Sequence, residues 1–334
     1  MKQRRGAAGM NNRGIALILV VLIMAVIVAF TLQFNRSSRV QVYEAANIGD
    51  GIVLEYIAKS GIYVGKYVFK EEDGDVVSFR DDWARAEELS LASASLFQIG
   101  HCEVRVIDES GKIPLNRLVG EGDQVDEALR GLLRRFFSLP DFGLSERDAY
   151  DIVAAIEDWI DEDDEVAMPE GGGLGAEQGY YRSLDPPYDC KNGPLDSIDE
   201  LMLIRGITED LYYGRDGIPG IRDFFTVQET DHININTAPL LVLRALSPEI
   251  TEDMAVRMDE YRRDEDTELD RSTWYRNISG MGNITIDSGL IGVTSNTFAV
   301  ESTGRLDRMI RRITAVVQRD QPGDMPVVVS WTVH

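Results

Sequence analysis

The densest group of chemically active side chains in the sequence is an acidic run. It reads Glu157-Asp158-Trp159-Ile160-Asp161-Glu162-Asp163-Asp164-Glu165. Carboxylates this close repel one another unless water solvates them or a cation bridges them. Asp161, Asp163 and Glu165 alternate like the first ligands of a calcium loop, in which oxygen atoms surround a hard cation. Val166 stands where an EF-hand needs its glycine, so the run is not an EF-hand.

A glycine-rich stretch follows the acidic run. It reads Met168-Pro169-Glu170-Gly171-Gly172-Gly173-Leu174-Gly175-Ala176-Glu177. The stretch lacks the Lys-Ser/Thr pair and the preceding strand of a phosphate-binding loop, so we interpret it as a flexible linker. A linker of this kind could fold back and offer Glu177, which makes Asp161, Asp163 and Glu177 the expected ligands if calcium binds. The alternative is an acidic helix end that water solvates.

Helices must position these side chains, because apolar residues recur at helical spacing from about residue 114 to residue 290. The expected helices are Asp126–Phe137, Ser145–Trp159, Ser197–Ile204, Ala238–Leu246 and Thr251–Arg262. Ser145 with Asp148 and Ser197 with Glu200 are typical helix starts, and the second pair forms a capping box. We therefore expect a helical domain of residues 114–290.

The charge of the chain argues against nucleic-acid binding. Net charge is −23, from 57 acidic and 34 basic side chains, and such a surface repels a phosphate backbone. Two segments, Ile198–Leu211 and Thr237–Tyr261, look like the helix-hairpin-helix units of DNA-binding proteins. Acids such as Glu209 and Asp210 lie where phosphate would bind, so we interpret both segments as packing units.

Strand-like segments lie on both sides of the helical block. His101–Asp108 alternates before it, after a loop and a short helix expected over residues 71–95. Asn296–Thr303, Ile310–Arg319 and Met325–Val333 have strand character after it. One strand before the block and three after it indicate that one domain is inserted within another.

The cysteines and histidines exclude several kinds of site. Cys102 and Cys190 form no CxxC pair, so the sequence does not support a zinc ribbon or a thioredoxin motif. With three histidines, a histidine-rich metal site or a histidine-centred catalytic triad is hard to build. In an oxidising compartment a Cys102–Cys190 disulfide is possible; the alternative is two buried thiols.

The first third of the chain carries a membrane signal. Residues Ile15 to Asn35 contain no charge, and as a helix they span roughly 30 Å, the thickness of a bilayer core. The preceding basic residues favour the cytoplasmic side. Helical spacing continues without proline from Arg36 to Phe69, so we expect one helix over residues 15–70, first in lipid and then amphipathic. A generic signal anchor is the alternative.

The start of this helix resembles the leader of type IV pilins and pseudopilins. Arg13-Gly14 is followed directly by Ile15-Ala16-Leu17-Ile18-Leu19. In that family a prepilin peptidase cuts after the glycine, which makes Gly14 and Ile15 the expected cleavage site. Most members have glutamate at the fifth mature position, where this chain has Leu19. A carboxylate in lipid persists only when it is paired, so its absence suits a subunit with no neighbour on that side, at the tip of an assembly.

The chain as a whole resembles the K-type minor pseudopilins of type II secretion. The segments that carry the resemblance, besides the leader, are Lys112-Ile113-Pro114-Leu115-Asn116, Asp158-Trp159-Ile160-Asp161-Glu162-Asp163, Gly193-Pro194-Leu195 with Asp199-Glu200-Leu201, Ile233-Asn234-Ile235-Asn236-Thr237-Ala238-Pro239, and Ser295-Asn296-Thr297-Phe298 leading to Gly304-Arg305. The resemblance implies an α+β pseudopilin fold, in which a long N-terminal helix packs on a small antiparallel sheet. The expected parts are a leader (1–14), the helix (15–70), the pseudopilin core (71–113 and 291–334) and an inserted all-α domain (114–290).

The resemblance also implies a function. A K-type subunit sits at the tip of the pseudopilus and initiates or caps its assembly, spanning the inner membrane once with its C-terminal domain in the periplasm. Expected partners are the I-type and J-type minor pseudopilins, prepilin peptidase and the inner-membrane assembly platform. Calcium in the helical domain and methylation are expected as well, and catalysis is not. The alternatives are a minor pilin that binds a substrate or surface ligand, and a membrane-anchored periplasmic enzyme.

Overall fold

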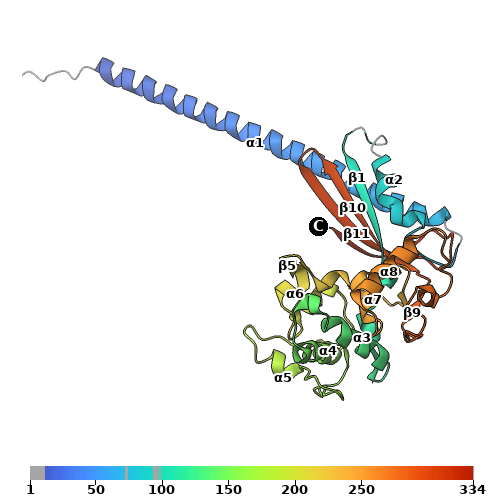
Figure 1. Ribbon diagram of the computed structural model, residues 1–334. Helices are drawn as coiled ribbons and strands as arrows, with labels where there is room; N and C mark the ends of the chain where they lie inside the picture. Colours follow the sequence, from blue (N-terminus) through green and yellow to red (C-terminus); the bar gives the residue numbers. More distant parts are fainter. Residues whose placement is uncertain (1–11, 72–73, 93–96, 98, 334) are drawn as a thin grey trace, which may run out of the picture. The chain divides into compact units, whose positions relative to one another are not determined.

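A computed structural model describes residues 12–71, 74–92, 97 and 99–333 (Figure 1). Most of the expected leader, residues 1–11, lies outside the described residues. The chain divides into two compact units, Met1–Tyr56 and Ile57–His334.

The first described element is one uninterrupted helix, α1 (Asn12–Val68). Its first part carries the apolar run, whose side chains are exposed. Among the described residues one helix is long and apolar enough to cross a membrane, and that candidate span begins at Gly14. The expected long helix is therefore confirmed, and it fits a single-pass membrane anchor.

A four-stranded antiparallel sheet forms the centre of the second unit. Its strands are β1 (His101–Asp108), β10 (Thr297–Leu306), β11 (Met309–Gln318) and β12 (Val327–Val333), in the order β1-β10-β11-β12. These are the four strands that the sequence predicts. Val104 pairs with Ser302 across the first ladder and Thr303 with Arg312 across the second.

The last turns of α1 cover one face of this sheet. Gly61 lies against Ser302, and Gly65 lies against Val300. The ring of Phe69 is 4.5 Å from that of Phe298. These contacts belong to the smaller of the two hydrophobic cores. Short helical turns complete this layer: η1 (Phe69–Glu71), η2 (Asp82–Arg85) and α2 (Ala86–Ala92).

The chain between β1 and β10 folds around the larger hydrophobic core. Its α-helices are α3 (Glu127–Phe137), α4 (Glu146–Ile160), α5 (Gln178–Tyr181), α6 (Glu209–Tyr213), α7 (Leu240–Ala245) and α8 (Glu252–Arg263). Its 3-10 turns are η4 (Glu109–Gly111), η5 (Leu115–Arg117), η6 (Pro140–Phe142), η7 (Ile198–Leu203), η8 (Ile221–Asp223) and η9 (Trp274–Asn277).

Four short strand pairs tie these helices together. They are β2 (Ile113–Pro114) with β7 (Phe225–Thr226), β3 (Val119–Gly120) with β4 (Gln124–Val125), β5 (Gly214–Arg215) with β6 (Ile218–Pro219), and β8 (Ile233–Asn234) with β9 (Ile291–Gly292). The pairs β2–β7 and β8–β9 are parallel and join segments far apart in sequence.

The two cysteines lie in different hydrophobic cores. Cys102 is buried on β1 among the residues that pack under α1, and Cys190 is buried in the helical region. The structure does not join them by a disulfide. The alternative of two buried thiols therefore agrees with the structure, because each sulfur belongs to a different packed layer.

Candidate metal site

The C-terminal end of helix α4 places two carboxylate side chains close together. The Ser145 side chain caps its first turn by accepting from the Asp148 amide. The helix ends at Ile160, so Asp158 lies in its last turn and Asp161 is its C-cap residue. Positions three apart lie on the same face of a helix. Asp158 and Asp161 therefore project to the same side of the helix end.

The third carboxylate comes from the glycine-rich stretch, which folds back along α4. The Gly175 amide donates to the Ala167 carbonyl at 3.0 Å, and the Leu174 amide donates to the Asp151 carboxylate at 2.8 Å. The Arg205 guanidinium holds the Gly175 carbonyl at 3.0 Å. The returning chain places Glu177 at the N-cap of α5.

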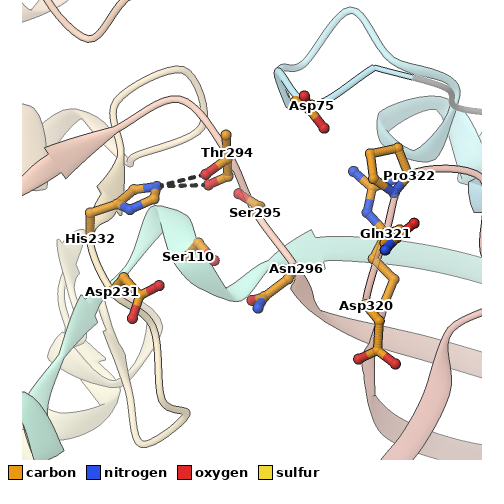
Figure 2. Close-up of a pocket in the computed structure, with 11 residues that line it drawn as sticks. Asp75, Ser110, Asp231, His232, Thr294, Ser295, Asn296, Asp320, Gln321 and Pro322 are labelled. Atoms are coloured by element: carbon orange, nitrogen blue, oxygen red, sulfur yellow. Dashed lines mark hydrogen bonds between the residues drawn. The ribbon is translucent and has the colours of Figure 1, made fainter.

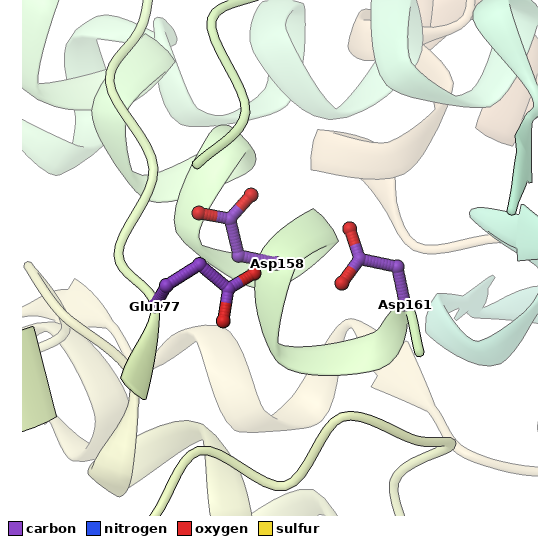
Figure 3. A group of neighbouring side chains, drawn as sticks. All are labelled: Asp158, Asp161 and Glu177. Atoms are coloured by element: carbon purple, nitrogen blue, oxygen red, sulfur yellow. The ribbon is translucent and has the colours of Figure 1, made fainter. Parts of the chain in front are cut away.

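Asp158, Asp161 and Glu177 form a compact cluster (Figure 3). One carboxylate oxygen from each lies within 4.8 Å of the others. The three residues are 0%, 8% and 4% exposed, in that order. Buried carboxylates this close cannot all be ionised without a compensating charge.

Each of the three carboxylates keeps a buried oxygen without a hydrogen-bond partner. These atoms are Oδ2 of Asp158, Oδ1 of Asp161 and Oε1 of Glu177. The other Asp158 oxygen accepts from the Ala167 amide at 2.9 Å. Unsatisfied buried oxygens are costly. Three of them together point to a bound cation that the oxygens would coordinate.

The electrostatics of the cluster lead to the same conclusion. Burial raises the pKa of Asp158 to about 7, and the nearby Glu157 charge adds to the effect. Burial and the Asp158 charge raise the pKa of Asp161 to about 8. Burial and the same Asp158 charge raise the pKa of Glu177 to about 7. Each carboxylate therefore resists ionisation, chiefly because it is buried and further because other carboxylates are near.

The basic side chains near the cluster form ion pairs with other acidic side chains. Arg130 donates to both oxygens of Glu157, at 3.0 and 2.8 Å, and Lys191 pairs with Asp196 and Glu200. In the part of the chain that the structure describes, no lysine or arginine forms an ion pair with Asp158, Asp161 or Glu177. The cluster is thus left without an internal counter-charge.

The chemistry of the donors suits a hard cation. All three unpaired atoms are carboxylate oxygens, the ligands that Ca²⁺ and Mg²⁺ prefer. Cys190 lies beside the site, with Sγ 3.6 Å from the Asp158 carbonyl oxygen. Burial raises the pKa of the Cys190 thiol to about 12. The thiol of Cys190 therefore holds its proton when no metal is bound.

The structure assembles two of the three predicted ligands and replaces the third. Asp161 and Glu177 meet, but Asp163 is exposed and accepts from the Glu165 amide at 2.6 Å. Asp158 takes its place in the cluster. Asp163 lies outside the cluster because α4 ends at Ile160, which places Asp163 beyond the helix face that Asp158 and Asp161 share.

A second concave region lies where the helical region meets the sheet (Figure 2). It is a polar cavity of about 290 Å³, lined among others by Asp75, Asp231, His232 and Asp320. The Nε2 atom of His232 lies 3.1 Å from both the carbonyl oxygen and the hydroxyl of Thr294. Through these contacts the His232 ring is bound to the loop that contains Thr294.

Several known proteins are similar to this chain in sequence. A family model described as protein K of the type II secretion system (T2SS) matches residues 111–214, which include the cluster. Type II secretion system protein K of Aeromonas hydrophila is 27% identical over 216 residues, 60% of each chain. The protein of the same name from Klebsiella pneumoniae is 24% identical over 231 residues, 68% of this chain and 67% of its own. The chain is similar in sequence to type II secretion system protein K.

A solved structure supports the same fold. A chain in the crystal structure of the GspK-GspI-GspJ complex from enterotoxigenic Escherichia coli superposes with a TM-score of 0.62 at 18% identity. The superposition covers 90% of this chain and 99% of the other. The expected α+β pseudopilin fold is confirmed. The chain spans about 60% of the length of the Aeromonas relative that it matches.

Proposed function

We propose that this chain is a minor pseudopilin at the tip of a type II secretion pseudopilus, where it initiates or caps assembly for export of folded proteins. The observation that carries the proposal is the match of residues 111–214 to the protein K family. That segment lies in the helical region between β1 and β10. This region makes the domain after α1 large. A head of this size leaves little room for another subunit above it.

The sequence of α1 supports a place at the tip. Leu19 stands where most pseudopilins carry a glutamate that is paired with a neighbouring subunit. Leucine removes both the cost of a carboxylate in lipid and the bond that would need a neighbour there. We propose that the helix crosses the inner membrane once, with the C-terminal domain in the periplasm. In this role the chain assembles with other subunits rather than catalysing a reaction.

The proposed partners are the I-type and J-type minor pseudopilins, prepilin peptidase and the inner-membrane assembly platform. The support for the first two is that the similar solved chain lies in a complex named for GspK, GspI and GspJ. The support for the peptidase is the sequence at Gly14 and Ile15, both of which lie in α1.

The first test is the N-terminal residue of the full chain, purified from cells with and without prepilin peptidase. A mature chain that begins at Ile15 only when the peptidase is present is the expected result. A Gly14→Val variant should stay uncut, and a Gly9→Val variant should be cut normally. An uncut wild-type chain, or cleavage after Phe34, would indicate a signal anchor or a secreted protein and would end the proposal.

We also propose that Asp158, Asp161 and Glu177 hold a calcium ion. The support is their separation, their burial and their three unpaired oxygens. A bound cation would offset the repulsion that raises their pKa values. Water or backbone carbonyls would have to complete the shell, because calcium takes more ligands than three carboxylates supply.

Isothermal titration of the full chain with calcium chloride tests this site. Asp161→Asn should weaken binding by at least about tenfold, because it removes one charged ligand. Glu165→Gln is the matched control, since Glu165 is exposed at the same helix end, and it should bind calcium like the wild type. Equal affinity of the Asp161→Asn variant and the wild type would show that the cluster does not hold the ion.

A further inference from the structure

The turn between β10 and β11 is basic in an otherwise acidic chain. Between Arg305 and Arg312 the sequence has four arginines and one acid, Asp307. The whole chain has 34 basic and 57 acidic side chains. This concentration of positive charge at one hairpin therefore contrasts with the rest of the surface.

Among the described residues, acidic side chains neutralise only part of this charge. Arg305 donates to the Glu103 carboxylate at 2.7 Å. Within residues 12–71, 74–92, 97 and 99–333, Arg308, Arg311 and Arg312 make no ion pair or side-chain hydrogen bond. The Nε atom of Arg311 is moreover buried without a partner. This buried atom is closed to other molecules, so the exposed side chains of Arg308 and Arg312 carry the charge that a partner can reach.

An exposed apolar side chain lies among these arginines. Ile310 is 57% exposed and sits between Arg308 and Arg311 in sequence. We call Arg308, Ile310 and Arg312 the arginine patch. Neighbouring strand residues point to opposite faces, so Ile310 and Arg312 share one face of β11, and Arg311 lies on the other face with the buried Ile313. Arginine next to an apolar anchor is the composition found at the centres of protein interfaces.

The contacts of α1 place the arginine patch at a defined end of the sheet. Along the helix, Gly61 lies against Ser302 and Gly65 against Val300, so the helix runs from the hairpin end of β10 toward its start. Gly100, which lies beside Leu306 next to the turn, is also close to Ile57. The patch is therefore at the end of the sheet where α1 begins its contact with β10.

We propose that the arginine patch docks on an acidic surface of the neighbouring pseudopilin subunit beneath this chain in the pseudopilus. This inference rests on the proposed function, because a tip subunit has neighbours only on the side of its membrane anchor. Opposite charge across such an interface orients the two subunits and speeds their association. Arginine can also bind a carboxylate with two parallel hydrogen bonds.

The test compares two double variants of the full chain with equal changes of charge. Arg308→Glu with Arg312→Glu reverses the exposed charge of the patch. Arg147→Glu with Arg271→Glu is the control, since these side chains are 83% and 81% exposed elsewhere. Each is co-expressed with the I-type and J-type pseudopilins of the same organism, and the complex is purified in detergent. The patch variant should recover about tenfold less of one partner, and the control should match the wild type.

Two further measurements identify the occupant. A photo-crosslinking amino acid at position 308 should label an acidic segment of the I-type or J-type subunit, whereas one at position 147 should not. Changing the labelled acid to arginine in the partner should restore assembly with the patch variant. Restored assembly also shows that the variant is folded. Binding of the wild-type complex should weaken as salt rises, and that of the patch variant should depend less on salt.

The outcomes separate this inference from the proposed function. If the wild-type chain recovers neither pseudopilin, the proposed function fails. If both pseudopilins are recovered equally with the wild type and the patch variant, the function stands and the docking inference is wrong. Crosslinks only to phospholipid, or only to a second copy of this chain, would also overturn it.

Discussion

The contact between Gly175 and Asp158 sets the shape of the carboxylate cluster. A Cβ atom at Gly175 would overlap the Asp158 carboxylate, whose Oδ2 is one of the unpaired oxygens. The side chain of Asp158 is fully buried and has little room to move away. The glycine is therefore required because the returning backbone passes directly over the cluster.

Gly175→Ala should weaken calcium binding by the full chain by about tenfold or more, because the methyl group displaces the Asp158 carboxylate or the returning loop. Calorimetric titration measures this effect. Gly179→Ala is the matched control, since a Cβ atom there would meet nothing within 4 Å. Unchanged affinity of the Gly175→Ala variant would mean that the loop or Asp158 moves without cost.

Asp108 is a buried carboxylate outside the cluster, at the point where β1 leaves the sheet. It accepts hydrogen bonds from the hydroxyls of Thr237 and Ser295, both at 2.6 Å. The Asn234 amide donates to the same oxygen at 3.2 Å. These donors belong to the helical region and to the chain that returns to the sheet. Asp108 thereby ties the two crossings between the cores to one another.

Burial raises the pKa of Asp108 from 3.8 to about 6, despite these hydrogen bonds. The folded chain then binds a proton that the unfolded chain has released, so the contribution of Asp108 is greatest below pH 4 and declines as pH rises to 6. Thermal unfolding of the wild type and Asp108→Asn across pH 4 to 7 measures this effect. The difference in Tm, wild type minus variant, should fall up to about pH 6 and then stay level. If the Tm of the wild type and that of the variant change with pH in parallel, the proposed contribution of Asp108 is wrong.

The carboxylate cluster was only partly predictable from sequence. Alternation in the acidic run drew attention to Asp163, although a helix that continues to Ile160 places Asp158 and Asp161 on one face. That spacing was the available signal for Asp158. The return of the glycine-rich stretch to place Glu177 was predicted from composition. The burial of all three carboxylates depends on tertiary packing and could not be read from the run itself.

At the level of elements, the contact between α1 and the sheet depends on small residues. Gly61 and Gly65 are spaced one helical turn apart and face Ser302 and Val300. A Cβ atom at Gly65 would lie 2.5 Å from Cγ1 of Val300. The close approach of helix and sheet therefore excludes a side chain here.

Gly65→Ala should lower the free energy of unfolding of the second unit by about 1 to 3 kcal/mol, because overpacking pushes the helix away from the strand. Chemical denaturation followed by tryptophan fluorescence measures this change, since Trp83 lies in the same core. Gly49→Ala is the control: its Cβ atom would meet nothing within 4 Å, and alanine there should be neutral or slightly stabilising. Equal stability of both variants would show that the interface can expand.

The elements themselves were largely predictable, for identifiable reasons. Alternation gave the four strands of the sheet, and the capping box of Ser197 and Glu200 is present as expected. The segment that follows it forms the 3-10 helix η7 rather than an α-helix. Short two-residue pairs such as β8 with β9 had no sequence signal, because they join segments separated by more than fifty residues.

At the scale of the whole molecule, the second unit holds two hydrophobic cores that polar contacts connect. The sheet core contains Trp83, Val104 and Phe298, and the other core contains the helices around the carboxylate cluster. Besides Asp108, the Arg80 guanidinium connects the layers by donating to the Arg262 carbonyl at 3.0 Å. A ligand at the cluster therefore acts first on the helical core.

Amide hydrogen exchange of the full chain, with calcium and with a chelator, shows how far this action extends. A hundredfold excess of calcium over its Kd stabilises the binding-competent state by about 2.7 kcal/mol. Exchange by local opening should then slow by about a hundredfold in residues 158–192, which surround the three carboxylates. Amides of β10 and β11 should change little, because their core is separate. A uniform slowing across both cores would mean that Asp108 and Arg80 couple them into one cooperative unit, and calcium would then stabilise the sheet that carries the arginine patch as well.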